Sequence, residues 1–146
     1  MPELNDAMRY ANVVSKAYVL PQQKVSSAIQ DFMESLVVLG KANSSLPFFS
    51  AVLAEDGWMR LRMHIALKAP VATVPDGLRF DSYFYVTHMA SLVVCGDIED
   101  KMPEAFSELN DFLEQKGLRP TTPPFIILSG DETLSYTIVK VGYTSA

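Results

Sequence analysis

The chain matches itself without gaps when it is shifted by 77 residues, and this internal repeat is the feature that most limits its fold. The identical pairs are Lys24 with Lys101, Ala28 with Ala105, Gly40 with Gly117, Pro47 with Pro124 and Phe48 with Phe125. A repeated sequence predicts a repeated structural unit. We therefore expect a single domain over residues 1–146, with a first repeat over about 13–67, a linker over 70–77 and a second repeat over about 80–143.

Each repeat contains the pattern of one helix among several strands. Apolar residues spaced three or four apart predict helices around 28–36 and 105–113. Val-rich and aromatic runs predict strands at 13–20, 48–53, 58–67, 80–87, 89–95, 125–128 and 134–141. The fold class predicted is α+β, with tandem pseudo-two-fold β-α-β-β repeats whose antiparallel sheet carries its helices on one face.

Residues at the ends of the predicted helices fit this assignment. Ser26 or Ser27 can cap the first helix, and Pro103 suits the first turn of the second. Gly40 and Gly117 follow the last apolar positions, where a left-handed residue commonly ends a helix.

Composition excludes several classes of function. The chain is 49% apolar and 20% charged, which is typical of a globular protein, and its net charge of -5 disfavours nucleic-acid and membrane surfaces. Met1–Asn12 lacks the apolar core of a signal peptide, so we expect a cytoplasmic protein. A single cysteine and two histidines without metal-ligand spacing predict no metal and no cofactor.

The alternation of side chains along the strands predicts which residues face the helices. The helix-facing sets are Val13, Ser15, Ala17, Leu61, Met63 and Ile65 in the first repeat, and Ala90, Leu92, Val94, Leu134, Tyr136 and Ile138 in the second. The opposite face then carries Lys16, Tyr18, Arg60, Arg62 and His64, with Ser91, Val93, Cys95, Ser135, Thr137 and Val139. We expect these faces to form a ligand cleft between the repeats. The alternatives are a solvent face or a dimer interface.

Several motifs resemble the GyrI-like family of small-molecule-binding domains. The stretch from Met89 through Asp97 to Met102-Pro103-Glu104-Ala105-Phe106, followed by Leu109, Gly117, Leu134 and Val141, is similar to the second half of these domains. Leu61-Arg62-Met63-His64 is similar to the L-R-Y-D run that closes their first half. The resemblance covers nearly the whole chain, from about Val13 to Val141.

The resemblance implies a stand-alone effector-binding domain, with a role in transcription regulation or stress response that acts through a partner. The acidic positions of the family fall on His64 and near Thr137 in this chain, so both carboxylates are replaced. Lys16, Arg62 and His64 then favour a neutral or anionic ligand of amphipathic or aromatic character. The ligand-binding residues predicted are Lys16, Tyr18, Trp58, Arg62, His64, Tyr83, Tyr85, Cys95 and Thr137.

Three functions stay open at this point. The leading prediction is a non-catalytic binding domain with a small-molecule ligand, no direct contact with nucleic acid or membrane, and room for a protein partner or a homodimer. The alternative is a small hydrolase that acts in the same cleft, although the family's general acid or base is missing. The third is a purely protein-binding role with a cleft filled by side chains.

Overall fold

The computed structural model describes residues 1–40, 42–54, 56–96, 98–130 and 135–146. Within these ranges the chain is an α+β protein with seven β-strands, two α-helices and a short 3-10 turn, and its strands pair antiparallel. The elements in chain order are β1 (Glu3–Pro21), η1 (Gln22–Lys24), α1 (Val25–Leu39), β2 (Phe48–Leu53), β3 (Trp58–Ala66), β4 (Leu78–Cys95), α2 (Ile98–Gln115), β5 (Leu118–Pro120), β6 (Phe125–Gly130) and β7 (Ser135–Ser145).

The chain divides into two compact units. The first, here the N-terminal unit, is Arg9–Tyr85, and the second, here the C-terminal unit, combines Met1–Met8 with Val86–Ala146. Because β1 and β4 are long, each contributes residues to both units. The described part of the N-terminal unit contains a strand, a helix and two further strands (β1, α1, β2, β3), and the C-terminal unit contains the same order in β4, α2, β6 and β7. That the two units form a tandem pseudo-two-fold repeat stays a prediction.

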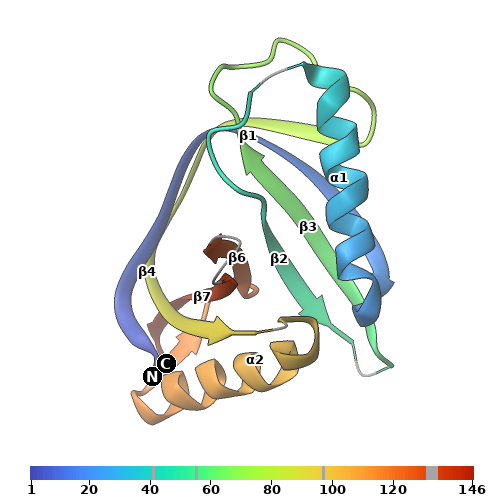
Figure 1. Cartoon of the computed structure of the whole chain (residues 1–146). Coiled ribbons are helices and arrows are strands. Elements are labelled where there is room, and N and C mark those ends of the chain that lie inside the picture. The colour runs from blue at the N-terminus through green and yellow to red at the C-terminus, as the bar shows by residue number, and fades with distance from the viewer. Residues whose placement is uncertain (41, 55, 97, 131–134) are drawn as a thin grey trace. The chain divides into compact units, whose positions relative to one another are not determined.

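The N-terminal unit is built around β3, which pairs with β1 on one side and β2 on the other. Helix α1 runs along these strands in Figure 1. Its buried residues Val25, Ala28, Phe32 and Leu36 are spaced three or four apart, which places them on one face. Gly40 ends the helix with a φ of 64°, and its backbone N–H donates to the carbonyl of Val37. The sequence pattern thus gives the helix both its buried face and its end.

The C-terminal unit is built around β7, which pairs with β4 and β6 and, near its end, with β5. Helix α2 contributes Met102, Ala105, Leu109 and Leu113 to the core. The first residues of β1 join this unit through polar contacts: Lys140 Nζ lies 3.1 Å from Asp6 Oδ2, and the Tyr143 hydroxyl donates to Asn5 Oδ1 at 3.1 Å. The chain termini accordingly lie side by side (Figure 1).

The observed elements correct several expectations. Strand β1 begins at Glu3, ten residues before the predicted start, and the two strands predicted at 80–87 and 89–95 are one strand, β4. His88 adopts a φ of 54° within β4 without ending it. Helix α1 has Lys24 and not Ser26 or Ser27 at its N-cap, and Pro103 lies inside α2 because that helix begins at Ile98.

The start of the last predicted strand falls outside the described residues. Leu134, its first residue, lies in the segment 131–134, whereas β6 extends past the predicted end at 128 to Gly130. No helix of the described chain combines the length and apolar character needed to cross a bilayer.

Replacing Phe32 of α1 with alanine tests the packing of the N-terminal unit. Phe32 is fully buried, so Phe32→Ala should lower the free energy of unfolding by about 3–5 kcal/mol through lost burial and the cavity left behind. Val38→Ala, on the exposed side of the same helix, should change it by less than about 0.5 kcal/mol. Urea unfolding followed by circular dichroism measures both. Similar values for the two variants would contradict the assigned face of α1.

Candidate functional site

The candidate site lies on the face of the β1–β3–β2 sheet that is opposite α1, here called the distal face. In the strand register Arg60 lies between Val19 and Val52, and Arg62 lies between Ala17 and Ser50. Residues that are directly opposite in antiparallel strands point to the same side of the sheet. The alternate row of β3, namely Met59, Leu61, Met63 and Ile65, is buried. The distal row of β3 is therefore Trp58, Arg60, Arg62 and His64.

One end of the distal face is closed by a cluster of four rings. The ring of Phe48 stacks on Tyr10 at 4.6 Å between centroids and on His64 at 4.9 Å. Phe84 packs against both Phe48 and His64, with centroid distances of 5.4 Å to each. Phe48 is fully buried and Tyr10 is half-buried. Such interlocked aromatic contacts hold the ends of β2 and β3 in a fixed geometry.

His64 is neutral at physiological pH in this cluster. Burial, together with the nearby charge of Arg62 and against an opposing effect of Asp81, lowers the pKa of its imidazole to about 4. The side chain is only 7% exposed. The predicted positive charge at His64 is therefore absent near pH 7.

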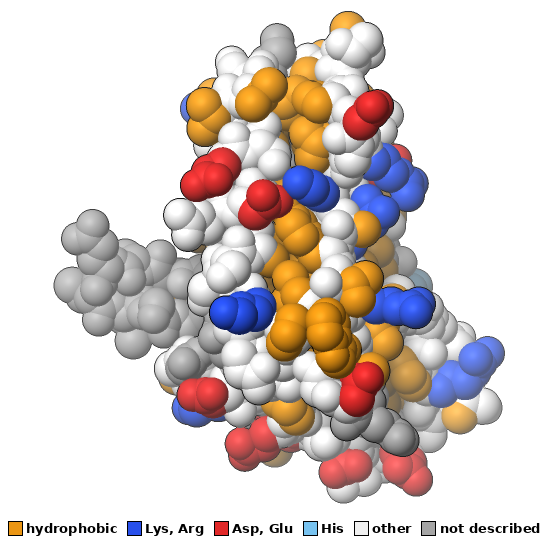
Figure 2. Space-filling view, turned by 90° about the vertical axis from the view of Figure 1, so that its right-hand side faces the viewer, with side chains coloured by type: hydrophobic (Ala, Val, Ile, Leu, Met, Phe, Trp, Pro, Cys, Tyr) orange, Lys and Arg blue, Asp and Glu red, His pale blue; other side chains and the backbone are white. Residues whose placement is uncertain are grey.

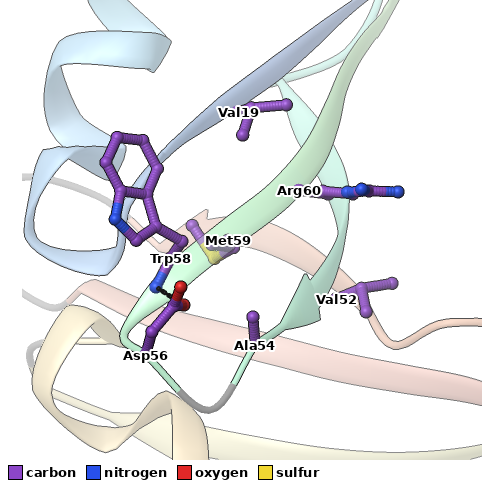
Figure 3. A pocket seen from close by; sticks show the side chains of 7 residues that line it. All are labelled: Val19, Val52, Ala54, Asp56, Trp58, Met59 and Arg60. Atoms are coloured by element: carbon purple, nitrogen blue, oxygen red, sulfur yellow. Dashed lines mark hydrogen bonds between the residues drawn. The ribbon is translucent and has the colours of Figure 1, made fainter.

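The other end of the distal face is an open groove. It has a volume of about 410 Å³ and is lined by Val19, Val52, Ala54, Asp56, Trp58, Met59 and Arg60 (Figure 3). Val19, Val52 and Trp58 are 67%, 52% and 47% exposed, which is unusual for large apolar side chains that lie together. Figure 2 shows a different side of the molecule, the one on which α1 lies, where hydrophobic side chains form a band flanked by charged ones.

A shallower hollow extends the groove along the sheet. It is lined by Ala17, Tyr18, Val19, Ser50, Val52, Arg60, Leu61 and Arg62 and shares Val19, Val52 and Arg60 with the first pocket. Arg62 donates from Nη1 to Ser15 Oγ at 2.9 Å, which orients its guanidinium along the face. The distal face thus offers an apolar groove that continues onto two arginines.

Of the predicted binding residues, Trp58, Arg62 and His64 share the distal face. Lys16 and Tyr18 do not, so their predicted placement on the same face as Arg62 and His64 is wrong, although Tyr18 borders the shallower hollow. Lys16 is opposite Met63 and Tyr18 is opposite Leu61, on the α1 side of the sheet. Their polar ends both reach Asp31 of α1, at 3.0 Å for Lys16 Nζ and 2.6 Å for the Tyr18 hydroxyl. Long amphipathic side chains can cover an apolar surface in this way and still keep their polar ends near water.

The contacts of Asp31 shift two pKa values. The hydrogen bond from Tyr18, with that from Lys16, lowers the pKa of the Asp31 carboxyl. Burial, followed by the Asp31 carboxylate, raises the pKa of the Tyr18 phenol. Lys16, Tyr18 and Asp31 therefore fasten α1 to β1.

Tyr83 and Tyr85 are exposed on β4 and contact each other, with ring centroids 5.9 Å apart. The guanidinium of Arg9 lies 4.6 Å from the centre of the Tyr85 ring. Phe84, between them in sequence, is the one that packs into the aromatic cluster, since adjacent strand residues point to opposite sides. A ligand-binding role for the two tyrosines stays a prediction.

Cys95 and Thr137 belong to the C-terminal unit. Cys95 is exposed at the end of β4. Thr137 is 4% exposed and pairs with Val94 and Leu128, so it lies on the same side of its sheet as the buried Val94, which the sequence predicts to face the helix. The predicted separation of Thr137 from Val94 is therefore wrong.

Sequence reasoning placed Arg60 on the face expected to form the cleft, but did not include Val19, Val52 or Arg60 among the binding residues. A local signal was present for Arg60, which lies between the buried Met59 and Leu61, and for Val52, which follows the buried Ala51. What could not be read from the sequence is the pairing that sets Arg60 between the two valines. Among the residues described, no group of three or more His, Cys, Asp or Glu side chains is placed to hold a metal ion.

The lowered pKa of His64 predicts a loss of stability in acid. Because the unfolded imidazole binds a proton near pH 6.5 and the folded one only near pH 4, stability present above pH 6.5 is lost as the pH falls through this window. The loss should reach about 3 kcal/mol by pH 4. Urea unfolding at several pH values should show this loss in the wild type and not in His64→Phe. His88→Asn, at the exposed histidine, should retain it. An unchanged pH slope in His64→Phe would contradict the assignment.

Comparison with solved structures places the fold among known ones. The C-terminal domain of EcmrR has a TM-score of 0.80 at 14% identity, with 100% of this chain and 98% of that chain covered. A hydrolase from Listeria innocua has a TM-score of 0.57 at 13% identity, covering 98% of this chain and 91% of that one. SAV2435, bound to tetraphenylphosphonium, has a TM-score of 0.56 at 12% identity, covering 96% and 93%. At these identities the likeness concerns the fold alone.

Sequence comparison gives a family. No curated protein matches the chain. One family model matches residues 9–144, which is most of its length. The chain therefore belongs to the family described as "Domain of unknown function (DUF5085)".

Proposed function

We propose that this protein is a small-molecule-binding domain of the GyrI-like type, and that it holds an amphipathic or aromatic, neutral or anionic ligand in the groove of the distal face. The observation that carries the proposal is the 410 Å³ groove in which the exposed side chains of Val19, Val52 and Trp58 adjoin Arg60. An apolar concavity with a few polar groups at its border is the usual form of a small-molecule site.

The apolar walls of the groove are exposed to solvent when no ligand is bound, so a ligand that covers them stabilises the folded protein. Burying apolar surface stabilises a complex by roughly 25 cal/mol per Å². Trp58 contributes most, since its indole offers a large flat surface on which a ring or chain can lie. The side chain emerges at the start of β3, and its backbone N–H donates to Asp56 Oδ1 at 3.0 Å (Figure 3). This contact holds the turn residue that lines the same groove.

The aromatic cluster supports the proposal by fixing the strands that carry the groove. Phe48 and His64 stack on each other at the closed end of β2 and β3, whereas Val52 and Arg60 occupy the open end of the same two strands. A site on strands that are already rigid loses less conformational entropy when a ligand binds. The cluster therefore contributes to binding without contact to the ligand.

One solved structure of similar fold, that of SAV2435, holds a small aromatic molecule, tetraphenylphosphonium, which supports small-molecule binding but not the ligand charge proposed for this chain. We also propose that the two units form a tandem repeat, because they share one pairing pattern. In the N-terminal unit β3 pairs with β1 and β2, and in the C-terminal unit β7 pairs with β4 and β6. The cleft predicted between the repeats stays a prediction. A role in transcription or stress response would act through a protein partner.

Trp58 is the single tryptophan of the chain, so its emission reports on the groove alone. Titration with 4-phenylbutan-1-ol, excited at 295 nm, should change that emission to saturation and raise the melting temperature. Val52→Asp should weaken binding at least about tenfold, because the ligand would then have to desolvate a carboxylate. Val38→Asp, at an exposed valine of α1, is the matched control and should bind like the wild type.

Two results would reject the proposal. The first is the absence of saturable change up to the solubility limit of the probe, and the second is equal binding by Val52→Asp and wild type. The hydrolase alternative predicts turnover of a 4-nitrophenyl ester that is lost in His64→Ala. His64 is enclosed by rings and 7% exposed, which is a poor position for a general base that must reach its substrate.

A further inference from the structure

Arg60 and Arg62 are two cationic side chains on one face of β3 that form no ion pair with a described carboxylate. The ion pairs of the described chain join Lys16 to Asp31, Arg79 to Asp81 and Lys140 to Asp6. Neither arginine of the distal face takes part in an ion pair with a described residue. Arg62 makes its side-chain hydrogen bond with the uncharged hydroxyl of Ser15.

The two arginines also lie next to each other. They are two residues apart on β3, so their side chains leave the same face about 7 Å apart. Like charges at this spacing repel each other, and the repulsion is stronger where solvent is partly excluded, as at the half-buried Arg62. A pair of this kind is stabilised by an anion that lies between the two guanidinium groups.

The neighbours of the two arginines leave room for such an anion. Ala17 and Ser50 flank Arg62, and Val19 and Val52 flank Arg60, so every cross-strand neighbour is small or uncharged. The nearest acidic side chain of the groove is Asp56, which already accepts the backbone N–H of Trp58, and Arg60 extends away from it in Figure 3. Within the described part of the chain, no ion pair therefore offsets the positive charge of Arg60 at the border of the groove.

We infer that the groove selects organic anions: an apolar body lies against Val19, Val52 and Trp58, and a carboxylate is held by Arg60 and Arg62. This inference rests on the proposed function and adds the chemical class of the ligand. The guanidinium of arginine can donate two parallel N–H groups to the two oxygens of a carboxylate. Two arginines therefore bind a carboxylate with better geometry than a lysine ammonium would. A cationic ligand of the same shape is repelled from the site.

Three probes with the same phenylbutyl body test the inference through Trp58 emission. They are 4-phenylbutanoate, 4-phenylbutan-1-ol and (4-phenylbutyl)trimethylammonium. The wild type should bind the carboxylate at least about tenfold more tightly than the alcohol, and the ammonium more weakly than either. Raising NaCl from 20 to 500 mM should weaken binding of the carboxylate and leave binding of the alcohol nearly unchanged.

Variants assign the preference to the two arginines. Arg60→Gln and Arg62→Gln should each lower the affinity for 4-phenylbutanoate about tenfold with little effect on the alcohol, and Arg62→Lys should lie between. Arg119→Gln removes the same charge from exposed β5 and should bind like the wild type.

The outcomes separate the inference from the proposed function. Equal binding of the acid and the alcohol by wild type overturns the inference and leaves the proposed function standing. Tighter binding of the ammonium does the same. Binding of none of the three probes overturns both. The comparison of probes and the salt series use the wild type alone, so they decide the question even if an arginine variant fails to fold.

Discussion

The structure of the N-terminal unit depends on the alternation of β3 between two environments. One row of its side chains, Met59 to Ile65, is buried against the sheet core beneath α1, and the other row carries Trp58, Arg60, Arg62 and His64. Because β3 is the central strand, its two neighbours must follow the same division, or charged groups would be buried without partners. Every feature of the distal face, from the ring cluster to the groove, follows from this register.

The helices and most strands could be predicted because their signals are local. Gly40 and Gly117 end α1 and α2 with φ values of 64° and 71°, as their positions after the apolar stripes indicate. The faces of β3 were also predicted, since Leu61, Met63 and Ile65 contrast sharply with Arg60, Arg62 and His64. Strand β1 offers no such contrast. Ser15 and Ala17 look suited to a helix-facing position, yet Ser15 pairs with His64 and Ala17 with Arg62. Only the pairing of strands, which is a long-range property, places them on the distal face.

The candidate site shows the same limit in its charges. The three cationic positions predicted for one cleft behave in three ways: Lys16 pairs with Asp31, His64 is neutral, and Arg62 donates to the hydroxyl of Ser15. Residue type alone could not separate them, because the pKa of histidine depends on burial and the role of lysine depends on which face it occupies. Arginine is charged in almost any protein environment, so the positive charge of a pair such as Arg60 and Arg62 can be predicted from sequence more directly than that of a histidine.

The course of β1 has a consequence for any attempt to isolate half of this protein. The C-terminal unit is discontinuous in sequence, since its Lys140 and Tyr143 find their partners in Asp6 and Asn5 at the opposite end of the chain. A fragment that starts in the segment 70–77 would lack these partners and one edge of its sheet, whereas a circular permutant that joins the neighbouring termini would retain them. The boundary between the repeats in the sequence thus differs from the boundary between the compact units by about one strand. A gene divided at the repeat boundary would therefore not encode two complete structural units.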